Sequence, residues 1–265
     1  MFGTVSPRRR RWSMQNERLP QATACECNRA QGFASSGSNG SVGRVDHAMT
    51  ANEVLSKLRP VSKQKLMTGA TIDQFERSAV IYHGDTPAAR FSLVLGGEVK
   101  LVTYSSKGTG LLIDIVLPNQ LFGVVFHPHS PVHPCTAVAL KPTELLSLRR
   151  KEFMDELETN LPLQRMLLAD TSQQLCRSIQ MRGFWLEEAR VRIAQALLYL
   201  FEKFGRVIPE TRATVAELAG TSVETAIRIT NRLARRGVLA TRRGQIEILS
   251  LAGLRAGAEG GGADL

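Results

Sequence analysis

The spacing of apolar residues changes along the chain. Between residues 79 and 148, apolar and polar positions alternate in short β-branched segments (79–85, 90–104, 110–117 and 135–140) that glycine and proline interrupt. Since side chains of a strand point alternately to its two faces, this pattern predicts an antiparallel β-roll or barrel. Helical spacing of three and four residues occurs before it, in residues 51–60 and 62–70, and returns at Lys151. The pattern therefore predicts an α+β fold.

A short amphipathic helix followed by a tight turn is expected from residue 214 onward. The turn falls at Gly220, which can take a positive φ without a Cβ penalty. Ser222 is then placed to cap a second helix, because its hydroxyl can accept from a backbone N–H of the first turn. The apolar stripe of the first helix consists of Val215, Leu218 and Ala219. Two short helices joined in this way indicate a helix-turn-helix.

The second of these helices, up to residue 236, has a polar outer face. Its inward positions at three- and four-residue spacing are Ala226, Ile229 and Leu233, and its outward positions are Glu224, Thr225, Arg228, Asn231, Arg232 and Arg235. Glu224 and Arg228 lie one turn apart, where a carboxylate can accept from cytosine N4 and a guanidinium can bind guanine O6 and N7. This is the expected reading helix of a DNA-binding module.

A basic hairpin is expected directly after this helix. Residues 238–251 form two alternating segments around Arg242, Arg243 and Gly244, which is typical of a wing that follows a phosphate backbone. No acidic residue lies between Arg228 and Arg243, and this stretch contains six arginines: 228, 232, 235, 236, 242 and 243. A positively charged stretch of this kind attracts the phosphate groups of a nucleic acid. The alternative is a charged face that contacts only solvent.

A seam for dimerisation is expected in the long helix before the DNA-binding module. Six positions there follow one another at alternating four- and three-residue steps, which is the spacing of the a and d positions in a two-stranded coiled coil. The positions are Leu168, Ser172, Leu175, Ile179, Arg182 and Leu186. The alternative is a helix that packs only on the β-roll.

Composition limits the class of protein. With 265 residues and 43% hydrophobic content, the chain is long enough for two modest domains, and its net charge of +10 favours an anionic partner. No window approaches the ~20 apolar residues of a membrane span, and no secretory signal precedes the fold, so we expect a cytoplasmic protein without a membrane partner. The expected parts are a disordered basic tail (1–48), a sensory domain (49–150), a dimerisation helix (151–183), a winged helix-turn-helix (184–252) and a flexible tail (253–265).

These features together resemble the CRP/FNR family of bacterial transcription regulators, over roughly residues 50 to 252. The resemblance rests on residues 82–102 with their turn glycines, on residues 192–200, on residues 220–233 and on the hairpin that follows. It implies a cyclic-nucleotide-binding-like double-stranded β-helix, a long dimer helix and a winged helix-turn-helix. It also implies a homodimer that binds double-stranded DNA and contacts RNA polymerase.

The family's DNA-reading pattern falls on Ser222, Glu224, Thr225 and Arg228. By this resemblance, Glu224 and Arg228 read the inner G·C pair of a palindromic operator with a TTGA-like half. Val223 is similar to the redox- and gas-responsive branch, whereas the cyclic-AMP branch usually has arginine there. Ile227 departs from the polar residue often found at its position. Arg232, Arg242 and Arg243 are expected to contact phosphates.

Several signals are compatible with the sequence. The family's phosphate-binding segment becomes Phe122, Gly123 and Val124 and later His133 and Pro134, and the pair that contacts the base becomes Arg177 and Ser178, which argues against cyclic AMP. An iron–sulfur cluster, a haem or metal site, a thiol switch at Cys135, or no ligand at all stay as alternatives. The candidate sensor residues are Cys25, Cys27, His127, His129, His133, Cys135 and Cys176.

An enzyme is the rival interpretation from another class. The spacing of His127, His129 and His133 resembles the metal site of cupin enzymes. No fourth ligand at the expected spacing follows, and a catalytic site would leave the helix-turn-helix unexplained. We therefore expect a regulator and not an enzyme.

Overall fold

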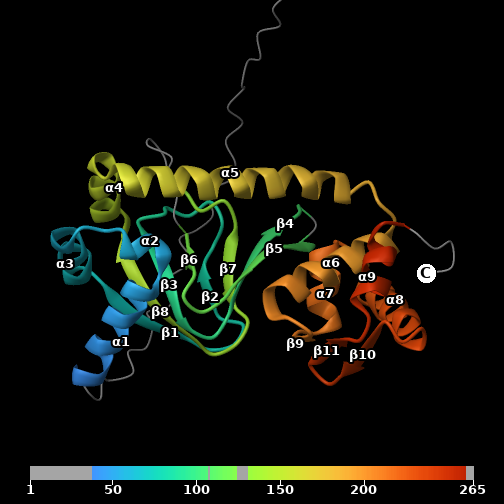
Figure 1. Ribbon diagram of the computed structural model, residues 1–265. Helices are drawn as coiled ribbons and strands as arrows, with labels where there is room; N and C mark the ends of the chain where they lie inside the picture. Colours follow the sequence, from blue (N-terminus) through green and yellow to red (C-terminus); the bar gives the residue numbers. More distant parts are fainter. Residues whose placement is uncertain (1–37, 107, 124–130, 261–265) are drawn as a thin grey trace, which may run out of the picture. The chain divides into compact units, whose positions relative to one another are not determined.

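The computed structural model describes residues 38–106, 108–123 and 131–260, and residues 39–265 belong to one compact unit. Three helices come first, α1 (Ser38–Ala51), α2 (Glu53–Ser56) and α3 (Pro60–Thr68). Eight strands follow: β1 (Thr71–Phe75), β2 (Val80–Tyr82), β3 (Arg90–Gly96), β4 (Val99–Tyr104), β5 (Gly110–Val116), β6 (Leu121–Phe122), β7 (Thr136–Ala139) and β8 (Thr143–Arg149). Figure 1 shows them as the teal to yellow-green part of the chain.

The second half of the unit is mainly helical. Its helices are α4 (Arg150–Thr159), α5 (Leu161–Phe184), α6 (Ala189–Phe204), α7 (Arg212–Ala219), α8 (Val223–Arg235) and α9 (Leu251–Ala258). Its strands are β9 (Val207–Ile208), β10 (Leu239–Arg242) and β11 (Gln245–Ile248). No helix in the described part of the chain has both the length and the hydrophobicity that crossing a membrane requires.

The eight strands form two four-stranded antiparallel sheets, β1-β8-β3-β6 and β2-β7-β4-β5. This arrangement confirms the predicted β-roll. Strand β3 is buried on both of its faces: Phe91 and Leu93 pack on the N-terminal helices, whereas Val94 faces the core between the sheets. Burial on both sides explains why the three apolar residues Leu93, Val94 and Leu95 follow one another in this strand. The edge strand β1 is mostly exposed, and the alternation of residues 79–148 did not predict it.

The predicted boundaries of both tails are wrong. The N-terminal tail was expected to reach residue 48, but α1 begins at Ser38, and Val45 and Met49 are buried one turn apart in the core with Phe91. The C-terminal tail was expected to begin at residue 253, but α9 continues to Ala258, and its Leu254 is fully buried. Two buried apolar residues in α1 and one in α9 thus pack these segments of small residues against a core.

The expected dimerisation helix is divided at Asn160, where α4 ends and α5 begins. The Oδ1 atom of Asn160 accepts from the backbone N–H of Leu163 at 3.1 Å, and its Nδ2 atom donates to Glu156 at 2.7 Å. Glu156 is 2% exposed and also accepts from Ser62 and from Nε of Arg59, at 2.9 Å for the latter. These hydrogen bonds lower the pKa of Glu156 to about 2, with Arg59 as the largest cause. One buried carboxylate thus ties the start of α5 to α3.

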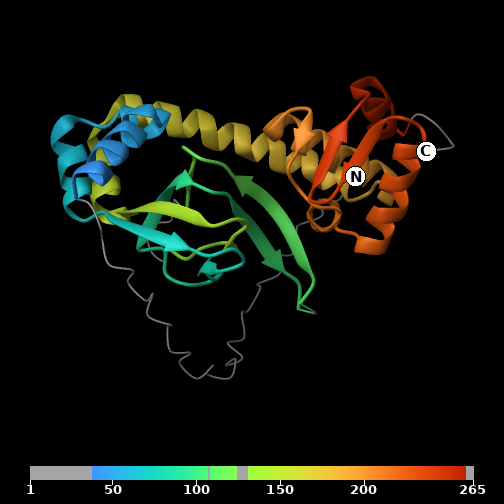
Figure 2. The same cartoon turned by 90° about the horizontal axis from the view of Figure 1, so that it is seen from below.

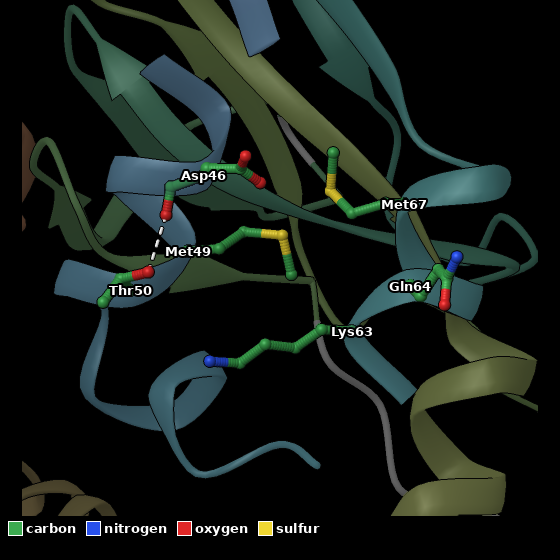
Figure 3. Close-up of a pocket in the computed structure, with 6 residues that line it drawn as sticks. All are labelled: Asp46, Met49, Thr50, Lys63, Gln64 and Met67. Atoms are coloured by element: carbon green, nitrogen blue, oxygen red, sulfur yellow. Dashed lines mark hydrogen bonds between the residues drawn. The ribbon is translucent and has the colours of Figure 1, made fainter. Parts of the chain in front are cut away.

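A shallow pocket of about 360 Å³ lies between α1 and α3. Figure 3 shows Met49 and Met67 approaching from the two helices, with Lys63 at the rim and the Thr50 hydroxyl donating to the carbonyl of Asp46. Its lining is mainly apolar, and it belongs to the packing of the N-terminal helices.

Candidate DNA-binding surface

The turn between α7 and α8 has the geometry that the sequence predicts. Gly220 ends α7 in the left-handed region, with φ 55° and ψ 48°. The backbone N–H of Thr221 closes the turn on the carbonyl of Ala216 at 3.0 Å. The hydroxyl of Ser222 then accepts from the backbone N–H of Thr225 at 3.2 Å and caps α8. The predicted helix-turn-helix and both of its local signals are confirmed.

The faces of α8 also agree with the pattern. Ala226 and Leu233 are buried, and Ile229 packs against the same core. Thr230, which the spacing did not place inside, is fully buried because its hydroxyl donates to the carbonyl of Ala226 at 2.7 Å. The outward residues Glu224, Arg228, Asn231, Arg232 and Arg235 are exposed, and Thr225 is half-buried.

The first two turns of α8 carry two exposed side chains of opposite charge. Glu224 lies in the first helical turn, where the helix dipole favours an anion. Its own backbone N–H and the Ser222 hydroxyl lower its pKa, so this carboxylate is ionised at neutral pH. Arg228 is exposed one turn later. The pair can therefore present an acceptor and a forked donor from one face of the helix.

Two contacts that the sequence did not predict hold this module in place. Nη1 of Arg212, the first residue of α7, donates to Oδ1 of Asn231 at 3.1 Å. Trp185, just after α5, has its ring against Gly220, and the guanidinium carbon of Arg192 lies 5.8 Å from the centroid of that ring. The Arg212–Asn231 and Trp185–Gly220 contacts join residues 19 and 35 positions apart, so no local pattern could have shown them.

The predicted wing is present. Strands β10 and β11 pair antiparallel around Arg243 and Gly244, and β9 adds a third strand to their sheet. Arg242 and Arg243 are both exposed at the tip of the hairpin. Figure 2 shows the hairpin beside α8, and the two elements are in contact. The exposed arginines of helix and hairpin thus belong to one basic module.

The long helix α5 presents apolar side chains to solvent at seven-residue spacing. Leu161, Leu168 and Leu175 are 53%, 69% and 60% exposed. Among the described side chains of α5, Leu163 is buried in the core with Phe153, and Phe184 is buried at the C-terminal end of the helix. Ser172 is exposed, and its hydroxyl donates to the carbonyl of Leu168 at 2.7 Å. The side chains of Ile179 and Arg182 lie outside the described residues, and Leu186 follows the end of the helix with 90% exposure.

The sensor candidates are only partly described. Cys25, Cys27, His127 and His129 lie outside the described residues, and Cys176 is exposed on α5. His133 is 4% exposed and stacks on Tyr82, with ring centroids 3.6 Å apart and an angle of 10° between the rings. Cys135 is half-buried, and burial is the main cause that raises the pKa of its thiol. Among the residues that the structure describes, no three His, Cys, Asp or Glu side chains come together as a metal site.

The buried His133 ring has an unusual environment. Within the described part of the chain its Nδ1 atom has no hydrogen-bond partner, and Gly123 lies so close that an added Cβ would be 3.4 Å from His133 Cε1. Burial lowers the pKa of His133, so the imidazole is neutral at pH 7. Gly123 and His133, which the sequence compares with two parts of the family's phosphate-binding segment, thus lie next to each other, and the His133 ring carries no positive charge.

Comparison with known proteins decides the family. A model of the cyclic nucleotide-binding domain matches residues 72–160, and a model of the Crp-like helix-turn-helix domain matches residues 191–256. The cyclic AMP receptor protein of Thermus thermophilus is 33% identical over 172 residues, which are 64% of this chain and 79% of that protein. The chain belongs to the CRP/FNR family.

Other relatives of this CRP/FNR protein are also transcription regulators. The transcriptional activator FnrA of Stutzerimonas stutzeri is 29% identical over 67% of this chain and 75% of its own. The transcriptional regulatory protein btr of Bordetella pertussis is 27% identical over 80% of this chain and 87% of its own. The solved structure of FixK2 from Bradyrhizobium japonicum superposes with a TM-score of 0.62 and 22% identity, over 70% of this chain and 96% of that one, which supports the fold. The CRP/FNR chain is thus a DNA-binding transcription regulator.

Proposed function

We propose that this CRP/FNR protein binds, as a homodimer, a palindromic operator with TTGA-like halves and regulates transcription there in response to a signal sensed by the β-roll. The observation that supports this most is the exposed face of α8. This face carries Glu224 and Arg228 one turn apart. The two residues follow the N-cap Ser222, and the hairpin with Arg242 and Arg243 is in contact with the same helix. A carboxylate and a guanidinium on one helical face can read the two bases of a G·C pair.

The exposed leucines of α5 support the homodimer. Leu161, Leu168 and Leu175 repeat every seven residues, and a leucine at more than half exposure in one chain is stabilised when a second helix covers it. Two copies related by a twofold axis would present two reading helices about one DNA turn apart, on the order of 34 Å. A twofold protein requires a twofold operator, and a contact with RNA polymerase would follow at the bound promoter.

We propose that the signal is not cyclic AMP, although one relative carries that name. A cyclic phosphate needs a cationic or strongly donating partner. Where the sequence is compared with the family's phosphate-binding segment, this chain has the neutral, buried His133 ring, which stacks on Tyr82. The stacked, neutral ring thus disfavours a cyclic phosphate at this end of the β-roll, and the raised pKa of the Cys135 thiol disfavours a thiol reaction there. Another small ligand, a metal centre or no ligand are the remaining proposals.

Selection of binding sites from random DNA tests the proposal. The full-length protein is expected to enrich twofold sequences with TTGA-like halves, and added cyclic AMP is expected to leave the enrichment unchanged. Enrichment of a single asymmetric motif would contradict the dimer, and stimulation by cyclic AMP would contradict the effector assignment. Absorbance spectra and metal analysis of aerobic and anaerobic preparations then separate haem, cluster and metal-free forms.

A further inference from the structure

Two buried carboxyl groups meet where strands of the β-roll contact the helix-turn-helix. Glu98 directly precedes β4 and is 8% exposed, and Glu210 lies two residues before α7 and is 5% exposed. Their side chains are hydrogen-bonded to each other within the compact unit of residues 39–265. Because an ionised carboxylate only accepts hydrogen bonds, this bond requires a proton on one of the two groups. A proton thus joins the two halves of the unit.

The other hydrogen bonds of this pair satisfy only part of it. Oε1 of Glu98 accepts from Nζ of Lys141, and Oε2 of Glu210 accepts from the hydroxyl of Thr214 at 2.9 Å. Oε2 of Glu98 is buried, and among the described residues no N–H or hydroxyl group donates to it. The ammonium group of Lys141 neutralises one carboxylate. If both carboxyls were ionised, one buried negative charge would therefore lack a compensating partner.

Two further pairs of charged groups cross the same contact. Nζ of Lys100 on β4 donates to Glu217 on α7 at 2.8 Å, and Lys203 on α6 pairs with Asp114 on β5. Each of these pairs consists of one cation and one anion, so each is neutral as it stands. The buried carboxyl pair differs from them, since it changes between a neutral and a negatively charged state with the loss of one proton.

From this geometry we propose that Glu98 and Glu210 form a pH-sensitive switch: a shared proton holds the helix-turn-helix against the β-roll, and loss of this proton weakens the contact. Burial is the largest cause that raises the pKa of Glu210, and the neighbouring Glu98 also raises it. When the contact opens, this pKa returns towards the ordinary value of 4.5, so opening releases a proton at any pH between the two values. Opening therefore becomes more favourable as the pH rises through this range. The inference is independent of the operator and the effector proposed above.

Hydroxyl-radical footprinting of the full-length protein without DNA tests this switch. Leu112 and Ile115 of β5 are 2% and 0% exposed and share one core with residues of α6 and α7, so their oxidation reports opening of the contact. Tyr104 at the end of β4 is 53% exposed and serves as the reference for the radical dose at each pH. From about pH 5 upward, the normalised oxidation is expected to rise by up to about tenfold per pH unit, because one proton is released, and then to level off. Constant oxidation across this range would overturn the inference.

Two variants assign the effect to the carboxyl pair. E210Q replaces one carboxyl by a neutral amide that can still donate to the other, so the contact is expected to stay closed and oxidation to become independent of pH. E98Q is expected to do the same and serves if E210Q fails to fold. The matched control is E217Q, which removes the partner of Lys100 at the same contact; it is expected to raise oxidation at every pH and to keep the rise with pH.

A rise with pH that persists in both E98Q and E210Q would overturn the inference. An opening that responds to added Mg²⁺ or Ca²⁺ and not to pH would also overturn it, since the carboxyl pair would then bind a cation in place of a proton.

Discussion

The ring of Trp185 lies so close to Gly220 that a Cβ atom added to this glycine would be 2.2 Å from ring atom Cζ3. Trp185 follows the last residue of α5, and Gly220 forms the turn before α8. The end of the proposed dimer helix is thus packed directly against the turn that orients the proposed reading helix. Any change in the direction of α5 at residue 185 reaches this turn through one side-chain contact.

Gly220→Ala is expected to destabilise the protein by about 2–4 kcal/mol, because left-handed backbone strain adds to overpacking against the ring. Gly237→Ala is the matched control: Gly237 has φ +70° but no neighbour within 4 Å of the added Cβ, so only the strain of about 1 kcal/mol remains. Chemical unfolding measures both. The excess cost of Gly220→Ala should disappear when Trp185→Ala is also present, and equal costs for the two glycines would show that the contact is unimportant.

Arg228→Ala is expected to weaken binding to the palindrome by about 1–3 kcal/mol and to relax the preference for one G·C pair in each half. The reason is that a guanidinium which binds guanine O6 and N7 contributes only where guanine is present. Affinities for the palindrome and for variants at this pair measure the effect. If the loss is the same on random DNA, Arg228 contacts phosphate and the reading helix is wrongly assigned.

Arg243→Ala, in contrast, is expected to weaken all sequences similarly. Arg243 is exposed at the tip of the wing, so a phosphate contact explains its role, and the slope of log K against log salt should fall by about one per site. Titrations at several salt concentrations measure this slope. A loss confined to one base pair would place the wing in a groove instead.

Leu168→Glu is expected to weaken dimerisation by on the order of 3 kcal/mol, since it replaces an apolar contact on both helices of the seam by a charge. Leu168 is 69% exposed within the chain, so the fold of the single chain is retained. Sedimentation equilibrium measures the dissociation constant. The control Ala169→Glu adds the same charge at the neighbouring exposed position and should leave the dimer intact. If both substitutions weaken dimerisation equally, the exposed leucines of α5 do not form the dimer interface.

Glu156→Gln is expected to lower the free energy of unfolding by about 2 kcal/mol, because hydrogen bonds to a buried charged group are lost. The pKa of Glu156 is depressed to about 2 from an ordinary value of 4.5. Its contribution to stability is therefore complete above pH 4.5 and is lost as the pH falls towards 2. Denaturant unfolding across this range measures it. A variant that shows the same pH dependence as the unsubstituted protein would exclude Glu156 as its source.

Local signals made much of the fold predictable from the sequence. Gly220 and Ser222 act within a few residues of themselves, as turn and cap, and the apolar positions of β3 and β5 report burial in the sheets. The turn, the helix cap and the two strands lie in the structure where the sequence predicts them. The DNA contacts and the effector are not fixed by such signals, and these assignments stay predictions.

Other elements depend on contacts that are distant in sequence. The helix α1 is rich in serine and glycine, and only the burial of Val45 and Met49 against Phe91 reveals why it forms. The start of α9 did carry a local signal, since Ser250 accepts from the backbone N–H of Gly253 at 3.1 Å and Leu254 follows at helical spacing. The contact of Trp185 with Gly220 spans 35 residues, so it could only be found in three dimensions.

The affinity of the full-length protein for one palindrome and for its separated half tests the central claim most directly. Both duplexes carry the TTGA-like sequence, with half-site centres about ten base pairs apart in the palindrome. A dimer that reads both halves is expected to bind the palindrome at least about 10³-fold more tightly than random DNA, with most of this gain lost on the single half. Equal affinity for the palindrome and the single half would contradict it.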